Sequence, residues 1–77
     1  MPRPRLSVHA QDRIAQQNLT EEDVHWILDD GQRDSSRWSG WKYTGYLPLD
    51  GKVEVCTTYD DTVVKTVIRL ERRGKRR

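Results

Sequence analysis

Hydrophobic positions recur at helical spacing through the first thirty residues. A first helix is predicted over residues 8–17, and its inward face consists of apolar residues four apart: Leu6, Ala10 and Ile14. Ser7 is placed to cap its start. Asn18 is expected to end it, because asparagine tolerates the left-handed conformation that follows many helices.

A second helix is predicted directly after the first. Thr20 and Asp23 have the spacing of a capping box, and acidic residues suit the positive end of a helix dipole. Three apolar residues form its inward stripe: Val24, Ile27 and Leu28. Gly31 is expected to supply the stop, as glycine commonly does after a helix. The short connection predicts that the two helices form a compact hairpin.

From Gln32 onward the hydrophobic period changes to two. This alternation predicts four strands, over residues 33–38, 41–47, 52–58 and 62–70. The first is weak, because serine and aspartate have low strand propensity. Turns are expected where glycine, proline or paired aspartates interrupt the pattern, at Ser39-Gly40, 48–51 and Asp60-Asp61. Across the first of these turns, Trp38 and Trp41 are a candidate cross-strand pair.

Alternation within the strands predicts which side chains face the core. In the second strand one face carries Trp41, Tyr43, Gly45 and Leu47, and in the third strand Val53 and Val55 lie opposite Glu54 and Cys56. In the last strand the expected core face carries Val64, Thr66, Ile68 and Leu70, because the other face holds two cations among Val63, Lys65, Val67 and Arg69. A core-facing Thr66 hydroxyl would require a hydrogen-bond partner.

The element order predicts an α+β fold, in which an N-terminal helical hairpin packs on one face of a three- to four-stranded antiparallel sheet. The sheet is expected to be antiparallel because hairpins connect its strands. We expect a disordered basic arm over residues 1–5, a single domain over 6–70 and a basic tail over 71–77.

Composition limits the size of the core and the class of protein. The chain has 77 residues, of which 34% are hydrophobic and 34% are charged, so the core must be small. A single cysteine, Cys56, excludes an internal disulfide framework and suits a reducing compartment. No apolar run approaches membrane-spanning length. We therefore expect a cytoplasmic protein without membrane contact, either a monomer or a weak dimer.

The net charge of +2 hides an asymmetry between the ends and the middle of the chain. The ends hold eight cations against Glu71 alone, a net charge of +7: Arg3, Arg5, Arg69, Arg72, Arg73, Lys75, Arg76 and Arg77. The remainder therefore carries −5. Basic ends of this kind favour docking on nucleic acid or on an acidic protein, and they are equally typical of a solvated tail that aids solubility.

His9 and Arg13 are the first candidates for chemistry. They are four residues apart and share one face of the first predicted helix. A neutral imidazole accepts or donates a proton near neutral pH, and the guanidinium fork matches a phosphate. The alternative is an ordinary exposed polar face. Two histidines and one cysteine on distant elements show no metal-ligand spacing, so neither a metal nor a cofactor is expected.

The aromatic hairpin is the second candidate. Aromatic and basic side chains alternate here, which is typical of surfaces that stack bases and contact phosphates: Arg37, Trp38, Trp41, Lys42, Tyr43 and Tyr46. A chain without phenylalanine also needs some of these rings in its core, and Trp41 and Tyr43 suit that best. The predicted nucleic-acid contacts are therefore Arg37, Trp38, Lys42, Arg69, Arg72, Arg73, Lys75, Arg76 and Arg77.

Three short motifs together resemble a known family. They are His9-Ala10-Gln11-Asp12-Arg13, then Leu19-Thr20-Glu21-Glu22-Asp23-Val24, and finally Lys65-Thr66-Val67. Their order and spacing resemble the bacterial domain of unknown function numbered forty-two fifty-eight, from about Leu6 to Leu70. That family looks like a relative of the RelE-type and BrnT-type toxins, which are metal-independent ribonucleases of toxin–antitoxin systems.

The resemblance implies a RelE-like fold and matches three polar positions, His9, Arg13 and Thr66, which are the predicted catalytic residues. In this interpretation His9 takes a proton from a ribose 2′-hydroxyl, Arg13 stabilises the phosphorane, and Thr66 orients the histidine or a phosphate oxygen. The chain departs from the pattern at Gln17-Asn18, where members often carry a second arginine. The loss of that cation leaves open whether the endoribonuclease activity is retained.

Three functions therefore stay open from the sequence. The first is a toxin-like, metal-independent ribonuclease or a degenerate relative of one. The second is a non-catalytic nucleic-acid-binding module that uses the tail and the aromatic hairpin. The third is a protein-interaction domain whose partner is an acidic, antitoxin-like protein. RNA is the partner that the first hypothesis requires.

Overall fold

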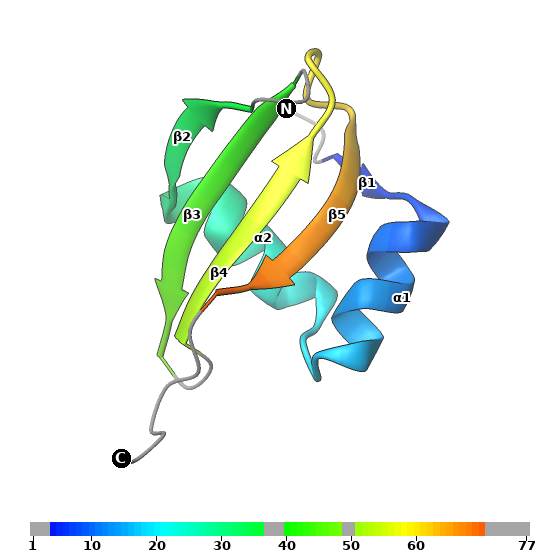
Figure 1. Ribbon diagram of the computed structural model, residues 1–77, viewed down its shortest axis with the longest axis vertical. Coiled ribbons are helices and arrows are strands. Elements are labelled where there is room, and N and C mark those ends of the chain that lie inside the picture. Colours follow the sequence, from blue (N-terminus) through cyan, green and yellow to red (C-terminus); the bar gives the residue numbers. More distant parts are fainter. Residues whose placement is uncertain (1–3, 37–39, 49–50, 71–77) are drawn as a thin grey trace.

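Five strands form one sheet against which two helices pack (Figure 1). A computed structural model describes residues 4–36, 40–48 and 51–70. Its elements are β1 (Arg5–Leu6), α1 (Val8–Gln16), α2 (Glu21–Asp30), β2 (Gln32–Ser35), β3 (Trp41–Leu47), β4 (Gly51–Thr57) and β5 (Val63–Arg69). The α+β class is confirmed. Arg37, Trp38 and the tail from residue 71 lie outside the described residues, as does the expected pairing of Trp38 with Trp41.

The sheet is mixed rather than wholly antiparallel, with the strand order β1-β5-β4-β3-β2. Strands β2 to β5 form the expected antiparallel meander, and β1 adds a fifth strand parallel to β5. Arg5 and Leu6 pair with Val63 and Val64, so Arg5 belongs to the sheet and not to an arm. Buried Leu6 anchors β1 in the core. A strand of two residues carries no periodicity from which it could be predicted.

The predicted helix starts are confirmed. Ser7 caps α1, and its hydroxyl accepts a hydrogen bond from the Ala10 backbone N–H at 3.0 Å. Thr20 and Asp23 form the expected capping box of α2, with bonds of 3.1 and 3.0 Å. Asn18, which follows the last turn of α1, has the expected positive φ of 59°.

Gly31 ends α2, but it does not adopt the left-handed conformation for which glycine is usually selected at this position. Its φ of −77° is accessible to any residue. A Cβ at this position, however, would lie 2.5 Å from the Ile27 carbonyl oxygen and 2.9 Å from the Thr44 carbonyl oxygen. Glycine is therefore required because the end of α2 lies directly against the backbone of β3.

Each helix packs on its own part of the sheet. Helix α1 contacts β1 and β5, and α2 contacts β3 and β4, so the helices do not form a hairpin whose main contacts are with each other. Figure 1 shows α2 behind the central strands and α1 beside β5. The buried core residues come from both helices, from the connection between them and from the strands: Leu6, Ala10, Leu19, Val24, Ile27, Leu47, Val53, Val55, Val64 and Val67. Neither helix is long and apolar enough to cross a membrane, among the residues described.

The predicted core face of β3 and β4 is confirmed, but the prediction for β5 is wrong beyond Val64. Val64 pairs with Thr57, and Thr66 pairs with Cys56, so Lys65 is an extra residue that forms a β-bulge. The bulge reverses the alternation, and both Val64 and Val67 are fully buried under the helices. Thr66 consequently lies on the outer face of the sheet, opposite the face that was expected.

Candidate nucleic-acid interface

Helix α1 presents His9 and Arg13 one turn apart, as the spacing predicted. His9 is exposed, and Arg13 is half-buried. The Arg13 guanidinium donates a long hydrogen bond of 3.4 Å to the Gln16 side chain, its neighbour on the same face. Capping by Ser7 and burial of Ala10 fix this helix on the sheet, so both functional groups stand on a rigid element.

Thr66 does not join this pair. It shares the outer face of the sheet with its cross-strand neighbour Cys56, which in turn lies beside Lys42. Within the described residues, no hydrogen bond links His9 to Arg13 or to Thr66. The bulge at Lys65 is the physical reason, since it turns Thr66 away from the helices. The expected catalytic triad is therefore not assembled.

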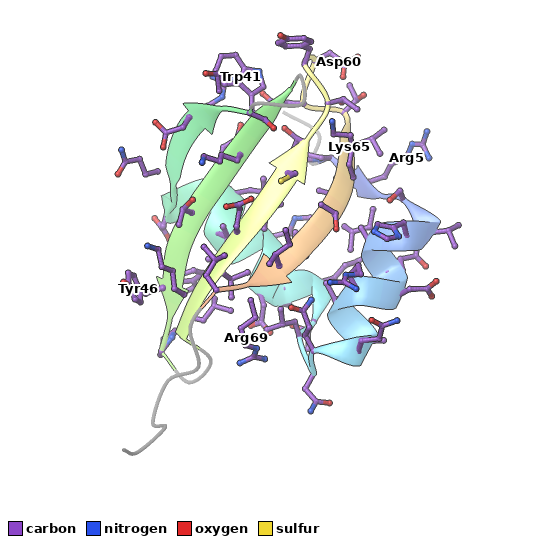
Figure 2. All side chains as sticks on the ribbon, viewed as in Figure 1. Arg5, Trp41, Tyr46, Asp60, Lys65 and Arg69 are labelled. Atoms are coloured by element: carbon purple, nitrogen blue, oxygen red, sulfur yellow. The ribbon has the colours of Figure 1, made fainter. Side chains whose placement is uncertain are left out.

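The side of the molecule formed by β1, α1 and β5 is basic. These elements carry four cations against the single carboxylate of Asp12, a net charge of +3: Arg5, Arg13, Lys65 and Arg69. We call this surface the basic edge. Figure 2 shows Arg5 and Lys65 towards one end of the edge and Arg69 towards the other.

Helix α2 carries the opposite charge. It has five carboxylates and no lysine or arginine: Glu21, Glu22, Asp23, Asp29 and Asp30. It packs on β3 and β4, away from α1. The fold thus separates charges that the sequence places close together, and a polyanion would be oriented toward α1 and β5.

Gln17, just after the last turn of α1, has a structural role at the edge of β5. Its side-chain amide donates to the Val67 carbonyl oxygen at 3.0 Å and accepts from the Arg69 backbone N–H at 2.7 Å. The Arg69 guanidinium donates in return to the Gln17 carbonyl oxygen. Closer to β1, the Ser7 hydroxyl donates to the Lys65 carbonyl oxygen at 3.2 Å. Side chains therefore continue the pairing that β1 begins along the edge of β5.

The aromatic rings of β3 divide between the two faces of the sheet. Tyr43 packs beside the core, and its hydroxyl donates to Asp61 at 3.0 Å, while Tyr46 is exposed on the outer face. The Arg33 guanidinium lies 3.8 Å from the centre of the Trp41 ring and forms an ion pair of 2.8 Å with Asp61. Trp41 and Tyr43 are thus held in a polar cluster on the helix side and are not a free stacking surface.

Asp61 is the centre of that cluster, and it was missed from the sequence. Its carboxylate also accepts a hydrogen bond of 2.7 Å from Thr57, whose side chain is fully buried. Burial raises the pKa of Tyr43 above its ordinary value, and the bond to Asp61 adds to the shift. The paired aspartates that predict a turn at Asp60-Asp61 were the one local signal in the sequence, and the positive φ of Asp61, 60°, fits that turn.

Cys56 is unsuited to nucleophilic chemistry. Burial raises the pKa of its thiol to about 11, and a hydrogen bond to Glu54 acts in the same direction. Lys42, a predicted nucleic-acid contact, lies beside Cys56 on the outer face and away from the basic edge. In the described ranges, no three histidine, cysteine, aspartate or glutamate side chains gather as a metal site would require.

Comparisons of the chain with protein-family models, with curated proteins and with solved structures gave no match.

Proposed function

We propose that this domain binds RNA along the basic edge and is a RelE-like relative of the toxin ribonucleases. The observation that carries the proposal is the charge separation between the basic edge, at +3, and α2, at −5. Phosphate contacts dominate the affinity of proteins for nucleic acid, so a surface of clustered cations is the expected footprint.

His9 and Arg13 supply the chemistry of the proposal. His9 accepts the proton of a ribose 2′-hydroxyl, and the 2′-oxygen attacks the adjacent phosphorus. The bond from phosphorus to the 5′-oxygen breaks, the leaving oxygen takes a proton from solvent, and a 2′,3′-cyclic phosphate remains. Arg13 stabilises the negative charge that builds on the phosphoryl oxygens. Thr66 has no part in this version, because it lies on the outer face of the sheet.

Non-catalytic RNA binding is the second candidate, and the position of Gln17 favours it. The resemblance leads us to expect a second arginine at this position, and the amide of Gln17, which stands in its place, is engaged by the edge of β5. Binding without cleavage is then the activity of a degenerate relative. The two candidate functions use the same surface and differ only in whether His9 acts as a general base in cleavage.

Fluorescence anisotropy with a labelled single-stranded RNA tests the shared surface. A double variant, Arg5→Ala with Arg13→Ala, lacks two of the proposed phosphate contacts. The magnitude of the slope of log affinity against log salt concentration should therefore be smaller by about 1.4 than in the wild type. Lys52→Ala, which removes a cation from the outer face, is the matched control and should change the slope little. An unchanged slope in the double variant would refute the proposal.

Cleavage separates the two candidates. A ribonuclease yields fragments with a 2′,3′-cyclic phosphate, and His9→Ala abolishes them while leaving RNA affinity within about twofold. RNA that stays intact with the wild-type protein, at equal affinity for wild type and His9→Ala, would establish binding without catalysis.

A further inference from the structure

The basic edge carries no aromatic ring on which a base could stack. Strands β1 and β5 and helix α1 contain neither tryptophan, tyrosine nor phenylalanine. The rings that the structure describes belong to other elements: Trp26 to α2, Trp41, Tyr43 and Tyr46 to β3, and Tyr59 to the turn between β4 and β5. Stacking on aromatic rings supplies much of the affinity of proteins for single strands. A nucleic acid on the basic edge is therefore held by its backbone.

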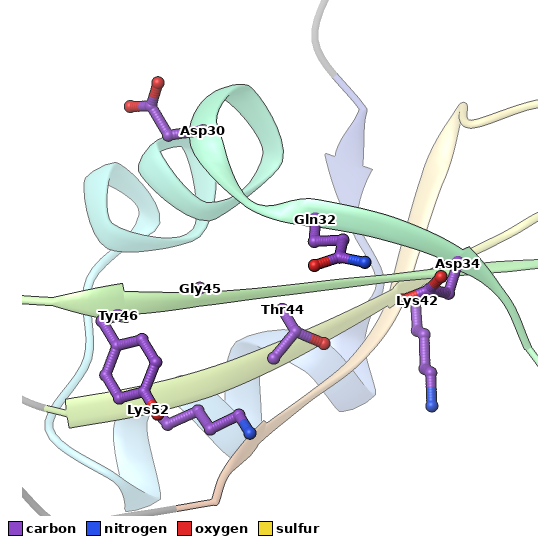
Figure 3. A pocket seen from close by; sticks show the side chains of 8 residues that line it. All are labelled: Asp30, Gln32, Asp34, Lys42, Thr44, Gly45, Tyr46 and Lys52. Atoms are coloured by element: carbon purple, nitrogen blue, oxygen red, sulfur yellow. The ribbon is translucent and has the colours of Figure 1, made fainter.

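The rings elsewhere do not combine stacking with phosphate contacts. Trp26 stands on acidic α2, and Tyr59 packs edge-on against Trp41 with 6.5 Å between the ring centres. Tyr46 lines an open pocket of about 560 Å³ beside β2 and β3 (Figure 3), where the Lys52 ammonium lies 5.9 Å from its ring centre. The charged groups of this pocket are two aspartates and two lysines, so it has no net attraction for phosphate.

The cations of the basic edge have a fixed spacing. Arg5 lies opposite Val63 at the start of β5, and Arg69 ends that strand six positions further along, at a distance of about 20 Å. The Arg5 backbone N–H donates to the Thr62 carbonyl oxygen at 3.0 Å, and the Arg69 guanidinium donates to the Gln17 carbonyl oxygen, so both ends are fixed on the sheet.

A double helix suits such a spacing better than a single strand does. Its phosphates already form an ordered array, and its two strands give it the higher charge density. A single strand loses conformational entropy when it is ordered along both ends of the edge. Without stacking, nothing on the basic edge offsets that loss.

Helix α1 presents a polar stripe beside these cations. His9, Arg13 and Gln16 are four and three residues apart and share one face, where the Arg13 guanidinium donates to the Gln16 side chain. An RNA duplex displays its 2′-hydroxyls in a wide, shallow minor groove, within reach of hydrogen-bonding side chains. A DNA duplex lacks these hydroxyls, so the stripe favours RNA.

We propose that the basic edge binds double-stranded RNA in preference to a single strand. Helix α1 lies over the minor groove, and the cations of β1 and β5 contact the phosphates beside it. This preference rests on the proposed function, whose RNA surface it uses, and it concerns binding alone, whichever of the two candidate functions holds. Backbone contacts carry no sequence information, so the base sequence of the duplex should matter little.

Fluorescence anisotropy with three labelled probes tests this preference on the full chain. The probes are an RNA duplex of about 16 base pairs, one of its strands alone, and the DNA duplex of the same sequence. The single strand contains only adenine and cytosine, so that it does not pair with itself. At low salt the RNA duplex should bind about three- to tenfold tighter than either other probe, because it alone combines ordered phosphates with 2′-hydroxyls.

Two variants test where the duplex lies. Asp12→Asn removes the one carboxylate of β1, α1 and β5 and should tighten binding of the RNA duplex by about two- to threefold. Tyr46→Ala removes the most exposed ring of β3 and is the matched control, which should leave the affinity for every probe unchanged.

The outcomes separate this preference from the proposed function. Single-strand affinity that equals or exceeds that of the RNA duplex, and is still lost in the Arg5→Ala, Arg13→Ala double variant, would overturn the preference and leave the proposed function standing. Weaker binding by Tyr46→Ala would also overturn it, and equal affinity for the DNA duplex would overturn the role given to α1. Binding of no probe, or full affinity in the double variant, would overturn both.

Discussion

The backbone N–H of Arg69 donates to the side-chain oxygen of Gln17 at 2.7 Å, although 52 positions separate them in the chain. The same amide group donates to the Val67 carbonyl oxygen. One side chain thus takes the place of a strand beyond the end of β1. It closes the edge on which the proposed RNA surface is built.

Loss of the Gln17 amide should destabilise the fold. Gln17→Ala breaks three partly buried hydrogen bonds, one to the Arg13 carbonyl oxygen and two to backbone groups of β5 that are then left unpaired, which costs about 1–3 kcal/mol. Gln16→Ala, which removes only the long bond to Arg13, should cost under about 0.5 kcal/mol. Urea unfolding measures both. Equal midpoints for the two variants would contradict the role given to Gln17.

The bulge at Lys65 predicts opposite effects for two neighbouring residues. Val67 is fully buried, so Val67→Thr places a hydroxyl in the core and should cost about 1–3 kcal/mol. Thr66→Val changes a residue on the outer face and should stay within about 0.5 kcal/mol. Thermal or urea unfolding compares them. A larger loss of stability for Thr66→Val than for Val67→Thr would show that Thr66 lies on the core face, as the alternation predicted.

These residues also show where sequence reasoning ends. The helix caps at Ser7 and Thr20 and the alternation in β3 and β4 depend on neighbours within a few positions, and they were predicted correctly. The bulge is invisible, because either alternation of β5 places apolar residues on one face. The contacts of Gln17 and Asp61 join distant segments. The sequence placed His9 and Arg13 together correctly. It placed Thr66 on the wrong face of the sheet, because the pattern gives no sign of the bulge at Lys65.

The Asp61 cluster should stabilise the β4–β5 turn. Asp61→Asn keeps the shape of the side chain but weakens its bonds to Arg33, Tyr43 and Thr57. We expect a loss of about 1–3 kcal/mol in the free energy of unfolding. Asp12→Asn, which changes an exposed carboxylate on α1, serves as the comparison. A cost no greater than that of Asp12→Asn would show that the cluster contributes little.

The Cys56 thiol should react slowly with alkylating reagents. Its ionisation should also lower the free energy of unfolding at alkaline pH. A pKa of about 11 leaves roughly a hundredfold less thiolate near pH 8 than an ordinary thiol with a pKa of 9. The raised folded pKa contributes stability that is fully present below pH 9 and is lost as the pH rises through about 11.

Iodoacetamide labelling and urea unfolding check these two effects. Labelling of the folded protein should be slow and should accelerate on unfolding. Because the pKa of Tyr43 is raised too, its stabilisation is also lost above pH 10, so Cys56→Ala should remove only part of the alkaline loss. Fast labelling of the folded protein near neutral pH would show that the thiol is not protected.

An NMR titration with single-stranded RNA at low salt shows whether RNA binds along the basic edge. Amide shifts should concentrate on β1, α1 and β5, with His9 and Arg13 among the residues most affected, and should fade as salt is raised. Shifts confined to α2 or β2, or no shifts with an RNA that the chain binds, would contradict the account.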